Sequence, residues 1–157
     1  MRVLGIDPGT RRLGWGVVEQ KGQRLRAIAA GVLVLDPRAE LAERLAAAFD
    51  GIEALLEDHA PDEIAVEDIF YARYPSAAIR LGHVRGVVLL AAARAERPIG
   101  QWPPALVKRT VAGAGAAGKG QVARIMAATL GLRTPPPSDA ADALAVAVTH
   151  LRSIRLR

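Results

Sequence analysis

Short apolar segments and amphipathic segments alternate along the chain, and their periods predict both strands and helices. Residues 2–7 form an apolar run that ends in an aspartate and the turn signal Pro8-Gly9, which is typical of a buried strand. Two more strands are expected over 13–20 and 25–35, joined by a hairpin at Lys21-Gly22. The beginning of the chain therefore predicts three consecutive strands.

From residue 38 the spacing becomes helical. Over 38–59 the apolar positions fall on one face of a helix, and they are Leu41, Leu45, Ala48, Ile52 and Leu55. Further strands are expected over 63–67 and 99–102, and helices over 76–97, 104–111, 121–130 and 138–151, with Ser138 as the cap of the last helix. Three strands followed by alternating helices and strands predict an α/β fold, with a mixed sheet that starts antiparallel and carries helices on its faces.

Length and composition limit the class of protein. The 157 residues fit one domain, 1–157, and 51% of them are hydrophobic, while aromatic residues make up only 4%. Cysteine is absent, so any metal must be held by oxygen or histidine, and carboxylates suit Mg²⁺ and Mn²⁺. The N-terminus reaches a charge too soon for a signal peptide, and the apolar stretches fall short of the ~18 residues of a membrane span. A cytoplasmic location without membrane contact is therefore expected.

Charge is divided unevenly along the chain. Residues 1–72 carry 8 basic and 13 acidic side chains, whereas residues 73–133 carry 10 basic side chains and one acidic one, a net charge of +9. Such asymmetry is typical of a surface that binds a polyanion such as nucleic acid. The alternative is a high arginine content on solvated faces without a binding role.

Four acidic residues are the strongest candidates for chemistry. Asp7 and Glu67 each end a short apolar strand, so if the two strands are parallel neighbours both acids point into one crevice. Asp139 and Asp142 are three residues apart on one face of the last helix, in its first turn, and this helix is apolar all round and therefore buried. Together they predict a site for a pair of divalent ions that hydrolyses phosphodiesters. The alternative for Asp7 and Glu67 is that each only caps its strand or pairs with an arginine. For Asp139 and Asp142 the alternative is that they cap the helix as a charge pair that faces solvent.

Four segments of the chain resemble the RuvC family of Holliday-junction resolvases, which have the RNase H-like fold. They are GIDPGT at 5–10 with LGWG at 13–16, EDIF at 67–70 with LGHVRGV at 81–87, VK at 107–108 with GAGAAGKGQV at 113–122, and DAADALA at 139–145 with TH at 149–150. The segments span nearly the whole chain in the family's order. The resemblance implies a five-stranded mixed sheet, its first three strands antiparallel and the others parallel, flanked by helices.

The resemblance also implies an activity and a set of site residues. It implies paired symmetric nicks at a four-way DNA junction by a homodimer, with the RuvA–RuvB branch-migration complex as partner and two Mg²⁺ or Mn²⁺ ions as cofactors. The implied catalytic residues and metal ligands are Asp7, Glu67, Asp139 and Asp142, with Lys119 beside the scissile phosphate. The candidate DNA contacts are Phe70, which would stack on an unpaired base, and Arg73, Arg80, Arg85, Lys108 and Lys119.

Two other functions fit parts of the pattern. The turn at 7–10 also opens the actin-like sugar kinases and chaperone ATPases, but those need a second such domain, for which 157 residues leave no room. A catalytically silent DNA-binding module is the second alternative. The four acids argue against this alternative, because negative side chains that face phosphates do not help a protein that only binds DNA. A metal-dependent junction nuclease remains the main hypothesis.

Overall fold

The computed structural model describes residues 1–69, 75–113 and 120–154, and within them the chain forms five strands and five helices. The strands are β1 (Arg2–Asp7), β2 (Arg12–Lys21), β3 (Arg24–Val34), β4 (Glu63–Glu67) and β5 (Ile99–Trp102). The helices are α1 (Leu41–His59), α2 (Pro75–Arg94), α3 (Pro104–Ala112), α4 (Gln121–Leu130) and α5 (Ser138–Ile154). Every strand and helix expected from the sequence is present, with ends that differ by a few residues.

The strands form one sheet in the order β3-β2-β1-β4-β5. β1, β2 and β3 pair antiparallel, and β4 and β5 then run parallel to β1. Gly22 supplies the positive φ, +58°, of the tight turn between β2 and β3. The predicted fold class, an α/β fold with a five-stranded mixed sheet, is confirmed.

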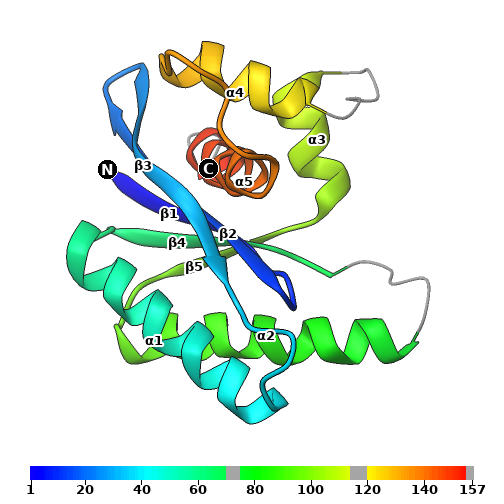
Figure 1. Cartoon of the computed structure of the whole chain (residues 1–157). Coiled ribbons are helices and arrows are strands. Elements are labelled where there is room, and N and C mark those ends of the chain that lie inside the picture. Colours follow the sequence, from blue (N-terminus) through cyan, green and yellow to red (C-terminus); the bar gives the residue numbers. More distant parts are fainter. Residues whose placement is uncertain (70–74, 114–119, 155–157) are drawn as a thin grey trace.

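Helices cover both faces of this sheet, with α1 and α2 on one side and α3, α4 and α5 on the other (Figure 1). Successive residues of a strand point to opposite faces, so each strand feeds two cores. In β1, Val3 belongs to the core under α5, whereas Leu4 and Ile6 belong to the core that α1 and α2 cover. The sheet is therefore buried on both sides, and only its edges and strand ends are open for a site.

Glycines bring α5 directly onto the sheet. A Cβ atom at Gly5 or Gly14 would collide with the backbone carbonyl oxygens of Ala143 and Asp139, and one at Gly16 would collide with the side chain of Leu144. Only glycine permits this backbone approach. The position of the first turns of α5 is therefore set by main-chain contact with β1 and β2.

The start of α5 differs in one detail from the sequence prediction. The N–H of Ala141 donates to the carbonyl of Pro137 at 2.8 Å, so the first helical hydrogen bond begins at Pro137. Ser138 is therefore the first helical residue, and its prediction as the cap is wrong. For the same reason only Asp139 lies in the first turn, and Asp142 lies in the second.

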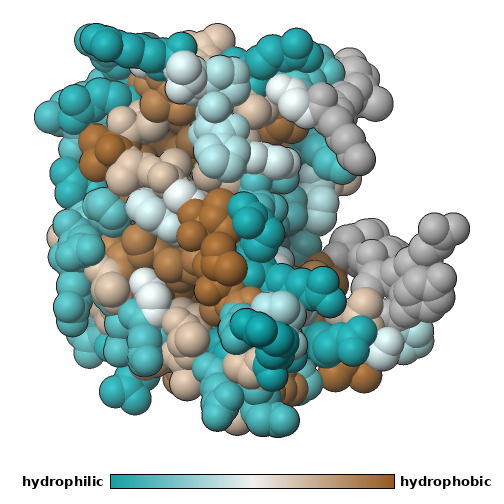
Figure 2. Space-filling model, in the orientation of Figure 1, coloured by the Kyte–Doolittle hydropathy of each residue, from teal (hydrophilic) through white to brown (hydrophobic). Residues whose placement is uncertain are grey.

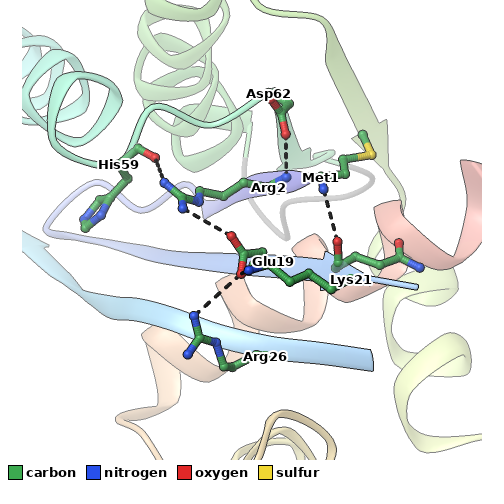
Figure 3. A network of polar contacts seen from close by, with 8 residues as sticks. Met1, Arg2, Glu19, Lys21, Arg26, His59 and Asp62 are labelled. Carbon is green, nitrogen blue, oxygen red and sulfur yellow. Dashed lines mark hydrogen bonds and ion pairs between the residues drawn. The ribbon is translucent and has the colours of Figure 1, made fainter. Parts of the chain in front are cut away.

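A polar network ties together the opposite, amino end of β1 (Figure 3). The guanidinium of Arg2 donates to the carbonyl of His59 at 2.6 Å and to Glu19 at 3.2 Å, and its backbone N–H donates to Asp62 at 2.7 Å. The hydrogen bond from Arg2 is the main cause that lowers the pKa of Glu19. The network joins β1 to β2 and to the segment before β4, and so fixes the strands whose other ends carry Asp7 and Glu67.

Among the described residues one helix, α2, has the length and apolar composition of a membrane span, whereas the sequence analysis judged every apolar stretch too short. Its most apolar stretch of 18 residues has a mean hydropathy of 1.3, and 22% of that stretch is buried. Val84 and Val88 on one face are in the core, while Ile79 and Leu90 on another are 62% and 53% exposed. Core helices of soluble proteins also meet this criterion, so length and composition alone decide nothing about a membrane.

Candidate active site

Four carboxylates from three elements converge at the carboxyl edge of the sheet. β1 and β4 are parallel neighbours with Ile6 opposite Val66, so the next residues, Asp7 and Glu67, lie side by side, and their carboxyl groups share a hydrogen bond. Asp139 and Asp142 from α5 lie close enough that both raise the pKa of Asp7. The structure thus brings acids from distant parts of the chain near one another.

Glu67 faces two cavities that lie between the sheet and its neighbouring helices. One, of about 180 Å³, has Glu67, Asp142 and Lys108 as its charged lining, together with Pro104, Val107, Val111, Val122 and Ala145. The other, of about 430 Å³, is lined by Glu67, Asp68, Ile69, Leu81, Pro103, Pro104 and Ala105. Figure 2 shows the surface hollowed on this side, between α3 and the start of α2. Of the four acids, Glu67 and Asp142 therefore line cavities on this side of the molecule.

The charges of these acids oppose one another. Burial, and then the charges of Glu67, Asp142 and Asp139, raise the pKa of Asp7 from 3.8 to about 8. Burial followed by the charge of Asp142 raises the pKa of Glu67, and burial followed by the charge of Asp139 raises the pKa of Asp142. Asp7 therefore keeps a proton at neutral pH unless a cation takes its place.

Asp139 has a partner of its own, Arg12 at the start of β2. Arg12 Nε donates to Asp139 Oδ2 at 2.6 Å, and the two side chains are 53% and 34% exposed. The sequence analysis left an arginine partner open for Asp7 and Glu67 but did not foresee one for Asp139. Arg12 itself was missed. The only signal for it was its place on β2 two residues before Gly14, on the strand face that meets α5.

The four acids have the ligand atoms that a divalent metal prefers, but their side chains are not arranged in a complete coordination sphere. Carboxylate oxygens are the hard donors that Mg²⁺ and Mn²⁺ prefer, and a cation would remove the repulsion that raises the pKa of Asp7. Among the residues that the structure describes, no three Asp, Glu, His or Cys side chains are already arranged around a common point for an ion. Asp139 already accepts a hydrogen bond from Arg12 at Oδ2.

The predicted DNA contacts differ in their surroundings. Lys108 on α3 is exposed. Its positive charge acts to lower the pKa values of Glu67 and Asp142, so it lies beside these acids. Arg80 on α2 is exposed. Arg85 is only 17% exposed and pairs with Asp68 at 3.0 Å, with a further hydrogen bond to Gln101, so in this structure it braces the ends of β4 and β5. The remaining predicted contacts lie outside the described residues: Phe70, Arg73 and Lys119.

His150 is buried between α5 and the sheet. It is 3% exposed, its Nδ1 accepts a hydrogen bond from Trp102 Nε1 at 3.1 Å, and its Nε2 lies 2.6 Å from Glu63 Oε2. Gly100 leaves the room for this ring, because a Cβ there would collide with Nδ1. The contacts lock α5 to β4 and β5 two turns beyond Asp142, and no feature of the sequence named the two partners.

Known proteins resemble this chain over nearly its whole length. Residues 3–150 match the family model described as "Crossover junction endodeoxyribonuclease RuvC". The chain is 54% identical over 151 residues to the protein of that name from Sorangium cellulosum, covering 96% of this chain and 84% of the relative. It is 49% identical over 150 residues to the one from Azorhizobium caulinodans, covering 96% and 89%.

Solved structures agree with these matches. The Thermus thermophilus RuvC structure in complex with a Holliday junction substrate has a TM-score of 0.89 and 35% identity, and the match covers 99% of this chain and 96% of that one. The yeast mitochondrial Holliday junction resolvase Ydc2, at a TM-score of 0.65 and 15% identity, shares the fold. The resemblance read from the four sequence segments is confirmed. The chain belongs to the RuvC family of crossover junction endodeoxyribonucleases.

Proposed function

We propose that this protein is a metal-dependent endodeoxyribonuclease that resolves four-way DNA junctions by paired symmetric nicks, in recombination and DNA repair. The observation that carries the proposal is the convergence of Asp7, Glu67, Asp139 and Asp142 at one edge of the sheet. They do so in a chain whose match to a RuvC bound to a Holliday junction covers 99% of its length. Each of the alternative functions lacks such support.

Membership in this nuclease family implies a general dependence on a divalent metal. The finer assignment is that Asp7, Glu67, Asp139 and Asp142 hold two Mg²⁺ ions, with Mn²⁺ as a substitute. The bound ions would activate the attacking water and stabilise the leaving oxygen. The raised pKa values of Asp7, Glu67 and Asp142 support this assignment, because a group of buried anions becomes favourable only with a cation among them.

Basic residues would bring the phosphodiester to these acids. Lys108 shares a cavity with Glu67 and Asp142, so its ammonium can attract a phosphate to the place where the carboxylates gather. Lys119 would steady the charge that develops on the phosphate, and Phe70 would stack on an unpaired base at the junction centre. Arg73, Arg80 and Arg85 complete the proposed contacts to the DNA arms, and Arg85 must first leave Asp68 to make one.

Two nicks placed symmetrically require two active sites, so we expect a homodimer. We place the contact between the two subunits on the exposed face of α2. Ile79, Gly82, Gly86 and Leu90 follow one another at helical spacing, and the space beside both glycines is open. A second copy of α2 can approach closely there. Burial of this face between two subunits also explains the high apolarity of α2 without a membrane, in keeping with a cytoplasmic protein. RuvA and RuvB are the expected partners in branch migration.

The decisive experiment compares two DNA substrates of the same sequence. The purified protein is incubated with a synthetic four-way junction and, separately, with linear duplex, in Mg²⁺ and in EDTA. Nicking of the junction alone, in Mg²⁺ alone, is expected. Nicking of both substrates would replace junction resolution with a broader nuclease activity, and nicking in EDTA would contradict the metal site.

A further inference from the structure

The contact between Arg12 and Asp139 follows from how β2 meets α5. Side chains alternate along a strand, so residues 12, 14 and 16 point to one face. Gly14 and Gly16 lie beneath the first turns of α5, where no side chain fits. Arg12 is the next position on that face, just beyond the start of the helix, and it meets the first-turn acid Asp139 at 2.6 Å.

This pair withdraws one of the four acids from the cluster. Glu67 and Asp142 line the same cavity, and Asp7 is hydrogen-bonded to Glu67. Asp139 does not belong to the described lining of either cavity that Glu67 faces. A divalent ion such as Mg²⁺ needs carboxylate oxygens at about 2.0–2.1 Å, and Asp139 Oδ2 already accepts the Arg12 N–H. In this conformation Arg12 competes with a metal for Asp139.

The competition is weak enough to be reversed. Both side chains are partly exposed, and an ion pair that is open to solvent contributes little to stability. A guanidinium forms stronger, bidentate contacts with a phosphate than a single bond from Nε to a carboxylate. A DNA backbone that reaches the site would therefore take Arg12 from Asp139, and a metal would take Asp139 in its place.

We propose that Arg12 is a positioning residue that keeps Asp139 out of the metal site until a DNA phosphate binds its guanidinium. Substrate binding and completion of the metal site are then one exchange of partners. The inference rests on the proposed function, because it needs Asp139 to be a metal ligand. It adds a residue and a sequence of events that the four acids alone do not provide.

The test measures metal binding without DNA. Mn²⁺ is titrated into wild-type protein, Arg12→Gln and Arg11→Gln by isothermal calorimetry. Arg11 is the matched control, because it is the exposed neighbour with the same charge and no ion pair among the described residues. Arg12→Gln is expected to bind Mn²⁺ about 2–5-fold more tightly than both other proteins, since metal no longer has to break the pair. Arg12→Lys, which can keep the pair, is expected to stay near wild type.

Two further readouts separate the possible failures. In EDTA, Arg12→Gln is expected to bind a four-way junction less tightly than Arg11→Gln, because it has lost a phosphate contact. Weaker Mn²⁺ binding by Arg12→Gln would show that Arg12 braces Asp139 for the metal, and equal binding by the two glutamine variants would show only a general charge effect. Either result overturns the inference. If wild-type protein cuts the junction, the proposed function survives both, whereas wild-type protein that binds no Mn²⁺ and cuts nothing defeats the proposed function itself.

Discussion

Replacing Asp7 by asparagine should stabilise the metal-free protein in alkaline solution while it abolishes cleavage. Unfolded Asp7 loses its proton near pH 3.8, whereas the folded protein holds it up to about pH 8. Between these values the folded state binds more protons than the unfolded state, so the free energy of unfolding falls as pH rises. The asparagine side chain has no proton to lose, and its amide can still donate a hydrogen bond to Glu67. The penalty therefore disappears in the variant.

The size of the effect follows from the same pKa. One pKa unit corresponds to about 1.4 kcal/mol, so the rise from 3.8 to about 8 sets an upper limit of about 6 kcal/mol above pH 8. Because Asp7 and Glu67 share a hydrogen bond, part of this energy belongs to the pair, and we expect about 2–3 kcal/mol for the single substitution.

Urea unfolding in EDTA, followed by circular dichroism near pH 4 and near pH 9, measures this difference. Wild type and Asp7→Asn should be close in stability near pH 4 and should separate near pH 9, where the variant is the more stable. Asp50→Asn, at an exposed position of α1, is the control for the loss of one carboxylate. Mg²⁺ should stabilise wild type more than Asp7→Asn. Lower stability of Asp7→Asn near pH 9 would refute the reasoning that buried like charges strain this site.

Other predictions address the remaining parts of the molecule. Glu67→Gln and Asp142→Asn should each abolish junction cleavage in Mg²⁺ and leave junction binding intact in a gel-shift assay, because they remove metal ligands and repulsion toward DNA together; normal nicking would remove that residue from the site. Gly14→Ala should lower the free energy of unfolding by about 1–3 kcal/mol, since its methyl group overlaps the carbonyl of Asp139, and unchanged stability and cleavage would mean that the contact yields. Leu90→Glu should convert a dimer to a monomer in sedimentation, and an unchanged mass would place the dimer contact elsewhere. Junction affinity should fall steeply with salt, as counterion release requires for a backbone-dominated footprint, and a flat titration would contradict it.

Local periodicity was enough to predict the strands and helices, and parallel-strand geometry was enough to bring Asp7 and Glu67 together. What the sequence did not reveal depends on contacts between distant segments. Arg12 and Asp139 are 127 residues apart in the sequence. They become neighbours because the backbone of α5 packs directly against Gly14. Arg85 was expected to be a surface residue that contacts DNA, yet in the structure it pairs with Asp68, just after the end of β4.

Some differences are local. Ser138 and Pro137 both fit the start of a helix, and the choice between them rests on which carbonyl accepts the first bond, which no residue preference determines. The partners of His150 come from β4 and β5, so they depend on the register of the sheet. Patterns along the chain thus identify elements and candidate groups, while the pairing of charges requires the assembled fold.

Because α5 rests on glycines of β1 and β2, the distance between this helix and the sheet does not depend on how side chains pack elsewhere in the core. Where a helix rests on a sheet through side chains, a larger or smaller residue changes the gap and moves whatever the helix carries. Here the spacer at Gly5 and Gly14 is the backbone itself, whose thickness no substitution elsewhere can change. Aliphatic exchanges in the layer beneath α1 and α2 can therefore alter stability while the acids on α5 keep their distance from those on the strands.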